Sequence, residues 1–257
     1  MNTLRAAFIL FVFTLLTLPL MPLQQLFVWF WPAMAKAFPM HYHRLVLRLL
    51  GIRLKVIGSV AKGPLLIASN HASWLDIPVL SALAPLSFIA KREVNSWPFF
   101  GSLARLQRTQ FIDRNTRHST GSSRNEMQAR LKAGDILVLF AEGTSGTGQH
   151  VLPFKSAFFG AAEIPGMRVQ PLTIAYSGHR NLPMNRRLRP LYAWYGRMQL
   201  PAHLWSALKQ GPIEVTVICH EPLAVETGTS RKTLARLAET LVAQGLSRAL
   251  HQRGEMG

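Results

Sequence analysis

The chain has 257 residues, of which 49% are hydrophobic, so it is long and apolar enough for one sizeable domain with an appended segment, and global disorder is excluded. Lys and Arg outnumber Asp and Glu by 29 − 12 = +17, which points to a polyanionic partner, either a nucleic acid or an anionic membrane surface. The single cysteine, Cys219, excludes an intrachain disulfide and cysteine-rich zinc modules.

The chain opens with an apolar stretch. Residues 6–35 carry no charge, and about 20 apolar residues suffice to span a bilayer. Polar residues and prolines interrupt the stretch near its middle (Pro19, Pro22, Gln24 and Gln25). The pattern predicts that residues 1–40 form a membrane-anchoring segment, either one kinked span or two half-spans in a re-entrant hairpin. Two alternatives are a cleaved signal peptide and a buried hairpin of a soluble protein.

The residues that follow the apolar stretch are basic. No acidic residue precedes Asp76, so the positive-inside rule predicts that everything after residue 36 stays in the cytoplasm. His41, Arg44 and Arg48 share one face of a predicted amphipathic helix that suits anionic lipid headgroups. Three aromatic side chains are placed as in an interfacial belt (Trp29, Trp31 and Tyr42).

From residue 52 onward, short apolar runs alternate with helical patterns. The runs predict buried or half-buried strands at residues 52–56, 64–68, 86–90, 136–141, 169–175 and 213–219. Helices are expected at residues 74–83, 98–106, 122–133 and 230–251, with Gly134 ending the third. The alternation predicts an α/β fold with a mixed central sheet flanked by helices and an apolar N-terminal membrane helix or helical hairpin.

One His-Asp pair follows the predicted strand at residues 64–68. His71 and Asp76 are five residues apart, so on a regular helix their side chains would point about 140° apart. They meet only if His71 lies on the loop before a helix and Asp76 lies in its first turn. A carboxylate that holds a histidine fixes its tautomer and stabilises the imidazolium, which makes the histidine a general base. Local packing of His71 and capping by Asp76 is the alternative.

Two further segments follow predicted strands. Residues 140–148 contain three glycines and three hydroxyl residues, a composition that lets backbone N–H groups face a ligand. Residues 91–114 place positive charge at strand ends, where it could neutralise a phosphate or carboxylate. An ordinary flexible loop and a solvated surface are the alternatives for these two segments.

Taken in order, these motifs resemble those of the glycerolipid acyltransferases that acylate 1-acylglycerol-3-phosphate. The resemblance covers about residues 64–180, within an acyltransferase domain of residues 41–257. It rests on Asn-His-x4-Asp at 70–76, Lys91 to Phe-Ile-Asp-Arg at 111–114, Phe-x-Glu-Gly-Thr at 140–144, and Val-Gln-Pro at 169–171.

The resemblance implies roles for the matching residues. His71 is expected to be the general base and Asp76 to orient it. The acceptor-binding positions are Lys91, Arg114, Glu142, Gly143, Thr144 and Ser145. The acceptor hydroxyl attacks an acyl thioester of acyl carrier protein or coenzyme A, so no cofactor and no metal are expected. The expected partners are anionic membrane lipids and the thioester carrier, without a nucleic acid. The expected location is a bacterial-type inner membrane, with the catalytic domain facing the cytoplasm.

Ser145 departs from the family pattern. The family usually has an arginine there, associated with gripping the acceptor phosphate, and serine supplies no charged fork. A subgroup that acylates lyso-ornithine lipid has a similar third motif, so lyso-ornithine lipid is the slightly favoured acceptor beside 1-acylglycerol-3-phosphate. The three arginines at 186, 187 and 189 are candidates to replace the lost charge or, equally, to bind the lipid surface. Alternatives to the enzyme are a basic nucleic-acid-binding protein and an inactive lipid-binding relative.

Overall fold

The chain folds around one central sheet. The structure, a computed structural model, describes residues 2–113 and 117–251, and Arg114 lies outside them. Within those residues the sheet has nine strands: β1 (Ile52–Ile57), β2 (Leu65–Ser69), β3 (Ser87–Lys91), β4 (Gln110–Ile112), β5 (Ile136–Phe140), β6 (Arg168–His179), β7 (Leu182–Pro183), β8 (Ile213–Cys219) and β9 (Leu223–Ala224). The strand order is β1-β8-β6-β2-β5-β3-β4, and β7 and β9 pair with β6.

The sheet is mixed, as predicted. β2 pairs in parallel with β5 and β6, and β3 with β4 and β5, whereas β6 and β8 are antiparallel. The central strand β2 is buried over its whole length. Leu65 and Ile67 enter the core on one face, and Leu66 and Ala68 enter the core on the other. A strand covered on both faces reads as a continuous apolar run, which is why the sequence revealed it.

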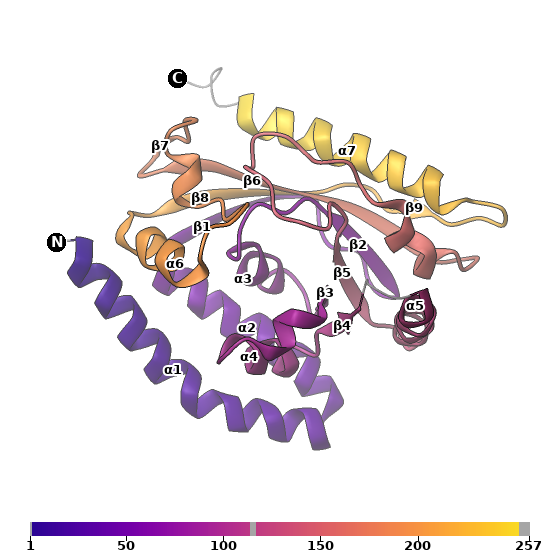
Figure 1. Cartoon of the computed structure of the whole chain (residues 1–257), viewed down its shortest axis with the longest axis horizontal. Helices are drawn as coiled ribbons and strands as arrows, with labels where there is room; N and C mark the ends of the chain where they lie inside the picture. The colour runs from indigo at the N-terminus through magenta and orange to yellow at the C-terminus, as the bar shows by residue number, and fades with distance from the viewer. Residues whose placement is uncertain (1, 114–116, 252–257) are drawn as a thin grey trace.

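Helices cover both faces of the sheet (Figure 1). The helices are α1 (Asn2–Phe30), α2 (Pro32–Leu50), α3 (Asp76–Ser81), α4 (Phe100–Leu106), α5 (Arg117–Lys132), α6 (Leu200–Lys209) and α7 (Arg231–His251), with short 3₁₀ segments η1 (Arg92–Ser96), η2 (Ser156–Ala162) and η3 (Arg189–Leu191). α2 and α3 contribute to one core, and α5, η2 and α7 to the other. The predicted α/β architecture is confirmed.

The N-terminal helices form an antiparallel hairpin, with its turn at a different place from the one predicted. α1 continues through Pro19 and Pro22 and ends at Phe30, and Pro32 begins α2. Thr17 Oγ1 lies 2.7 Å from Tyr42 Oη, and Gln24 Nε2 donates to the Ala35 carbonyl at 3.0 Å. The NH₂ group of Gln24 therefore finds an acceptor on the second helix without a break in the first, whereas its buried Oε1 has no described partner.

The hairpin packs along the domain, and α1 curves beneath it (Figure 1). Gln24 also donates to the Leu106 carbonyl at the end of α4, and Lys36 of α2 lies 2.7 Å from Asp135. α2 runs without interruption through residue 40, where the sequence placed a domain boundary, and ends at Gly51 with φ +74°. In the described chain, α1 is the one helix long and apolar enough to cross a membrane.

Several elements differ from the sequence-based expectations. β6 extends to His179, beyond the predicted end at residue 175, because its later residues pair with β8 across a bulge between Tyr176 and Gly178. β4 and α6 were not predicted. β4 has only three residues, and α6 packs against α1 through Leu204 and Leu208. Tyr42 was placed in an interfacial belt, but its hydroxyl faces Thr17 inside the hairpin.

Candidate functional site

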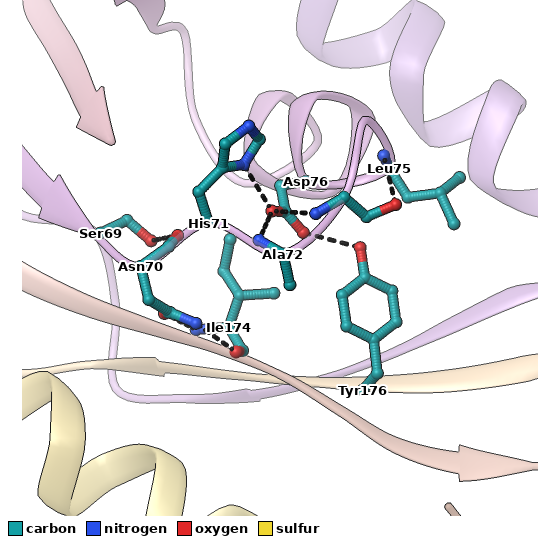
Figure 2. A network of polar contacts seen from close by, with 9 residues as sticks. Ser69, Asn70, His71, Ala72, Leu75, Asp76, Ile174 and Tyr176 are labelled. Atoms are coloured by element: carbon teal, nitrogen blue, oxygen red, sulfur yellow. Dashed lines mark hydrogen bonds and ion pairs between the residues drawn. The ribbon is translucent and has the colours of Figure 1, made fainter. Parts of the chain in front are cut away.

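The His-Asp pair forms at the carboxyl end of β2. His71 lies on the loop after the strand, and Asp76 is the first residue of α3. His71 Nδ1 lies 2.8 Å from Asp76 Oδ2, and because an ionised carboxylate can only accept, Nδ1 carries the proton. The predicted condition for the pair is met. The other ring nitrogen, Nε2, points away from Asp76 and is left to accept a proton (Figure 2).

The backbone of the loop creates this geometry. Asp76 Oδ2 also accepts from the N–H groups of Ala72 at 2.7 Å and Ser73 at 3.0 Å. Ala72 and Ser73 precede α3, so these bonds fix the loop that carries His71 and do not cap the helix, whose N-terminus has no side-chain cap. The same oxygen also holds the imidazole, so the path of the loop and the orientation of His71 depend on one atom. Capping of the helix by Asp76, the alternative in the sequence analysis, is not what the structure shows.

Tyr176 completes the contacts of the carboxylate. It comes from β6, and its hydroxyl donates to Asp76 Oδ1 at 2.6 Å (Figure 2). Both side chains are buried. Burial, together with the adjacent Asp76 charge, raises the pKa of Tyr176 well above its ordinary value, so the hydroxyl remains a donor. The sequence analysis missed this residue, because Tyr176 lies just beyond an apolar run that reads as core. The only available signal was that a buried tyrosine hydroxyl needs a partner.

Two other groups fix the His71 loop. The His71 ring stacks on Phe140 at the end of β5, with ring centroids 3.9 Å apart and an interplanar angle of 19°. Asn70 exchanges two hydrogen bonds with the backbone of Ile174 in β6, at 2.9 and 2.8 Å. The loop is thus attached to the two strands that flank β2, which limits how far the imidazole can tilt.

The loop after β5 lies against His71. Gly146 N–H donates to the His71 carbonyl at 2.8 Å, and Gly143 turns the chain with φ +73°. Glu142 is buried and accepts from Leu152 N–H at 3.3 Å. Burial raises the pKa of Glu142 to about 8, against the opposing effect of backbone hydrogen bonds. Thr144 is exposed and Ser145 half-buried. The structure therefore brings residues 142–146 to the His-Asp pair.

Of the two predicted basic residues, the structure describes Lys91. Lys91 ends β3, the strand next to β5, so it lies at the same edge of the sheet as Phe140, and its side chain is exposed. No described contact joins it to His71. Arg114 lies outside the described residues. Among the residues that the structure describes, no three His, Cys, Asp or Glu side chains gather as a metal site would require.

A large apolar cavity lies between the hairpin and the domain. Its volume is about 590 Å³, within the range of ligand pockets. Its walls come from α1, α2, α4, α6 and η1, and on the domain side they include Trp74, Phe88 and Trp97. Phe88 stacks on Phe140, which stacks on His71. Phe140 therefore lies between the cavity wall at Phe88 and the ring of His71.

We expect Tyr176→Phe to lower kcat about tenfold with unchanged KM values, because Asp76 Oδ1 loses its donor and the carboxylate can turn. Stability should fall by about 1–3 kcal/mol, the usual cost of leaving a buried polar atom unpaired. Steady-state kinetics and thermal melting measure both effects. Tyr192→Phe is the matched control, since that buried hydroxyl contacts His179 at 2.7 Å instead. Equal kcat loss in both variants would contradict the role of Tyr176.

Comparisons with known proteins agree on one family. A family model described as Acyltransferase matches residues 53–175. The chain is 44% identical to the lyso-ornithine lipid O-acyltransferase of Brucella abortus, over 97% of this chain and 96% of that protein. It is 36% identical to the 1-acyl-sn-glycerol-3-phosphate acyltransferase of Neisseria meningitidis, over 68% of each. The crystal structure of the 1-acyl-sn-glycerophosphate acyltransferase PlsC from Thermotoga maritima superposes with a TM-score of 0.70 at 21% identity, covering 96% of this chain and 94% of that chain.

Proposed function

Because the chain belongs to the acyltransferase family that contains the lyso-ornithine lipid and 1-acyl-sn-glycerol-3-phosphate acyltransferases, we propose that it moves a fatty acyl chain from a thioester to the hydroxyl of lyso-ornithine lipid. The chain is a lyso-lipid acyltransferase, which disfavours the nucleic-acid-binding alternative. The observation that carries the proposed chemistry is the 2.8 Å contact of His71 Nδ1 with the buried Asp76. An intact pair also argues against an inactive relative.

In the proposed mechanism, His71 acts as general base. The acceptor hydroxyl donates to Nε2 and attacks the thioester carbonyl, and its proton passes to the imidazole. Asp76 stabilises the resulting imidazolium across Nδ1. The tetrahedral intermediate collapses, the C–S bond breaks, and the imidazolium returns the proton to the thiolate. One ester and one thiol are formed, without an acyl-enzyme, a metal or another cofactor.

The donor site is proposed to be the apolar cavity. A long acyl chain needs a desolvated channel, and this cavity lies beside the Phe140–His71 stack. The thioester would then lie at His71, with its carrier outside. The carrier is acyl carrier protein or coenzyme A. The basic surface of the chain suits either anionic carrier.

The acceptor assignment rests on Ser145 and on the relatives. Lyso-ornithine lipid carries an amino acid in its headgroup, so the phosphate-gripping arginine usual at position 145 is not required. The 44% identity to a lyso-ornithine lipid O-acyltransferase over nearly the whole chain supports the same acceptor. Glu142, Gly143, Thr144 and Lys91, with Arg114 by family resemblance, are the proposed acceptor-binding residues. 1-Acyl-sn-glycerol-3-phosphate is the second acceptor, favoured by the relatives of that activity.

We further propose that the hairpin binds the bacterial inner membrane, with the domain in the cytoplasm. One face of α1 is buried against the protein, including Ala6 and Ile9, whereas large apolar side chains on its other face are exposed (Leu4, Phe8, Phe11, Leu15, Leu18, Trp29 and Phe30). A helix that is packed along a domain and apolar on its outer side suits insertion parallel to the membrane. The exposed His41, Arg44 and Arg48 of α2 suit anionic headgroups.

In the enzyme assay, isolated membranes receive a radiolabelled acyl thioester together with lyso-ornithine lipid or 1-acylglycerol-3-phosphate. Membranes that contain the His71→Ala enzyme give the background rate. His71-dependent product from lyso-ornithine lipid supports the proposal. Product from the phosphate acceptor alone would contradict the acceptor assignment, and product from neither would contradict the function.

For the membrane, we expect Phe8→Glu/Phe11→Glu to reduce binding to anionic vesicles more than about 100-fold. Each phenylalanine loses roughly 1.5–3 kcal/mol of apolar burial, and each glutamate adds a charge that resists insertion. Flotation of the full-length protein with vesicles measures the bound fraction. Leu237→Glu is the matched control, because Leu237 is 43% exposed but lies on α7, across the sheet. Equal losses in both proteins would argue against insertion through α1.

A further inference from the structure

Arg189 is a buried arginine without an acidic partner. It is 6% exposed and begins η3. Its Nη2 donates to the Met184 carbonyl at 3.2 Å, and Nε has no hydrogen-bond partner. None of the described carboxylates pairs with it, and the sequence contains no Asp or Glu between Glu163 and Glu214. Burying a cation without an anion is costly, so such a residue points to a charge supplied from outside the chain.

The segment that carries Arg189 lies directly on the catalytic loop. Trp194 N–H donates to the Ala72 carbonyl at 2.7 Å, and the N–H of the same Ala72 donates to Asp76. Gly148 separates Ala72 from the stem of Arg189. A Cβ at Gly148 would lie 3.3 Å from Ala72 Cβ and 3.6 Å from Arg189 Cδ, and its φ of +70° favours glycine. The absence of a side chain at Gly148 allows Arg189 to approach the residue next to His71.

The charges around Arg189 also favour an anion supplied from outside the chain. Arg186 is the charged neighbour of Arg189, and burial together with that like charge lowers the pKa of Arg189. Arg186 and Arg187 are themselves exposed. Meanwhile Ser145, on the other loop at His71, supplies no guanidinium. The site therefore lacks a cation at Ser145 and has an unpaired cation at Arg189. This pattern indicates that Arg189, and not position 145, binds the anion.

We propose that Arg189 binds the oxyanion of the acceptor headgroup, either the carboxylate of an amino-acid headgroup or a phosphate. This inference rests on the proposed function and names the residue that determines its acceptor specificity. A planar guanidinium pairs with a carboxylate or a phosphate through two parallel N–H···O bonds. The guanidinium has one described hydrogen bond, from Nη2 to the Met184 carbonyl, so its other N–H groups have no described partner within the chain.

Binding to the inactive His71→Ala enzyme tests the inference independently of turnover. Full-length protein in detergent receives lyso-ornithine lipid, 1-acylglycerol-3-phosphate or neutral monoacylglycerol, and intrinsic tryptophan fluorescence reports the Kd. Arg189→Met keeps the packing stem and removes the charge. We expect Kd for at least one of the anionic lipids to rise about 10- to 100-fold, with Kd for monoacylglycerol unchanged. Arg189→Lys should recover part of the loss, and the exposed Arg187→Met should have no effect.

Thermal melting separates binding from structure. Removal of an unpaired buried charge should leave the melting temperature of Arg189→Met unchanged or raise it. Equal weakening for all three lipids, or no weakening for either anionic lipid, would overturn the inference. If Arg189→Met fails to fold, Arg189→Lys decides by the same criterion. The activity of the wild-type enzyme with each lipid tests the proposed function separately, so the two can fail independently.

Discussion

Replacing His71 by alanine is expected to lower kcat for acyl transfer by about 10³-fold, because the acceptor hydroxyl loses the group proposed to take its proton. The KM values should change little, since in the proposed mechanism the ring contacts the reacting atoms and not the acyl chain or the headgroup. The His71 side chain is 17% exposed and is held by one hydrogen bond and one ring stack, so its loss should not unfold the domain.

Pre-steady-state and steady-state kinetics on purified enzyme measure this loss. His71→Gln is a second variant, because glutamine keeps an N–H for Asp76 but cannot take up a proton at neutral pH. His220→Ala is the control, since His220 is buried elsewhere and contacts Thr173 at 2.9 Å. A folded His71→Ala or His71→Gln enzyme with kcat within tenfold of wild type would show that another group is the base.

Asp76→Asn should lower kcat by about 10²- to 10³-fold. Asparagine has nearly the same size but no charge, so the imidazolium formed during proton transfer loses its counter-charge. Oδ2 accepts three donors, from His71, Ala72 and Ser73, so the asparagine oxygen must occupy that position. Its NH₂ then faces Tyr176, whose hydroxyl can rotate to accept. The tautomer of His71 is retained, and the loss of kcat reports the charge.

Asp135→Asn is the matched control for this variant. Asp135 is also buried, and it pairs with Lys36, Arg108 and Arg130, so its amide variant should lower the melting temperature without lowering kcat. Steady-state kinetics and melting curves on both variants separate the effect of losing the charge beside His71 from the effect of a general loss of stability. If Asp76→Asn keeps kcat within threefold of wild type, the charge of Asp76 is not needed and its role is to fix the loop at Ala72 and Ser73.

The relation between His71 and Asp76 was predictable because it is local. Six residues, an apolar strand before them and a short helix after them are enough to place a carboxylate beside an imidazole. The same holds for the buried strands, whose apolar runs are visible in the sequence, and for Gly134, whose φ of +85° ends a helix as expected. The family resemblance also came from motifs of a few residues each.

Contacts between distant segments were decided by the tertiary structure. Tyr176 reaches Asp76 across 100 residues only because β6 pairs with β2, a register that depends on packing of both sheet faces. Arg189 and Gly148 meet for the same kind of reason. The prolines of α1 suggested a break in its middle, but contacts of Gln24 with α2 and α4 stabilise the continuous helix. The sequence by itself determined most of the helices and strands and the contact between His71 and Asp76, because these depend on neighbouring residues. Only the packing of remote surfaces produces the contact of Tyr176 with Asp76, the burial of Arg189 without an acidic partner and the position of the N-terminal hairpin.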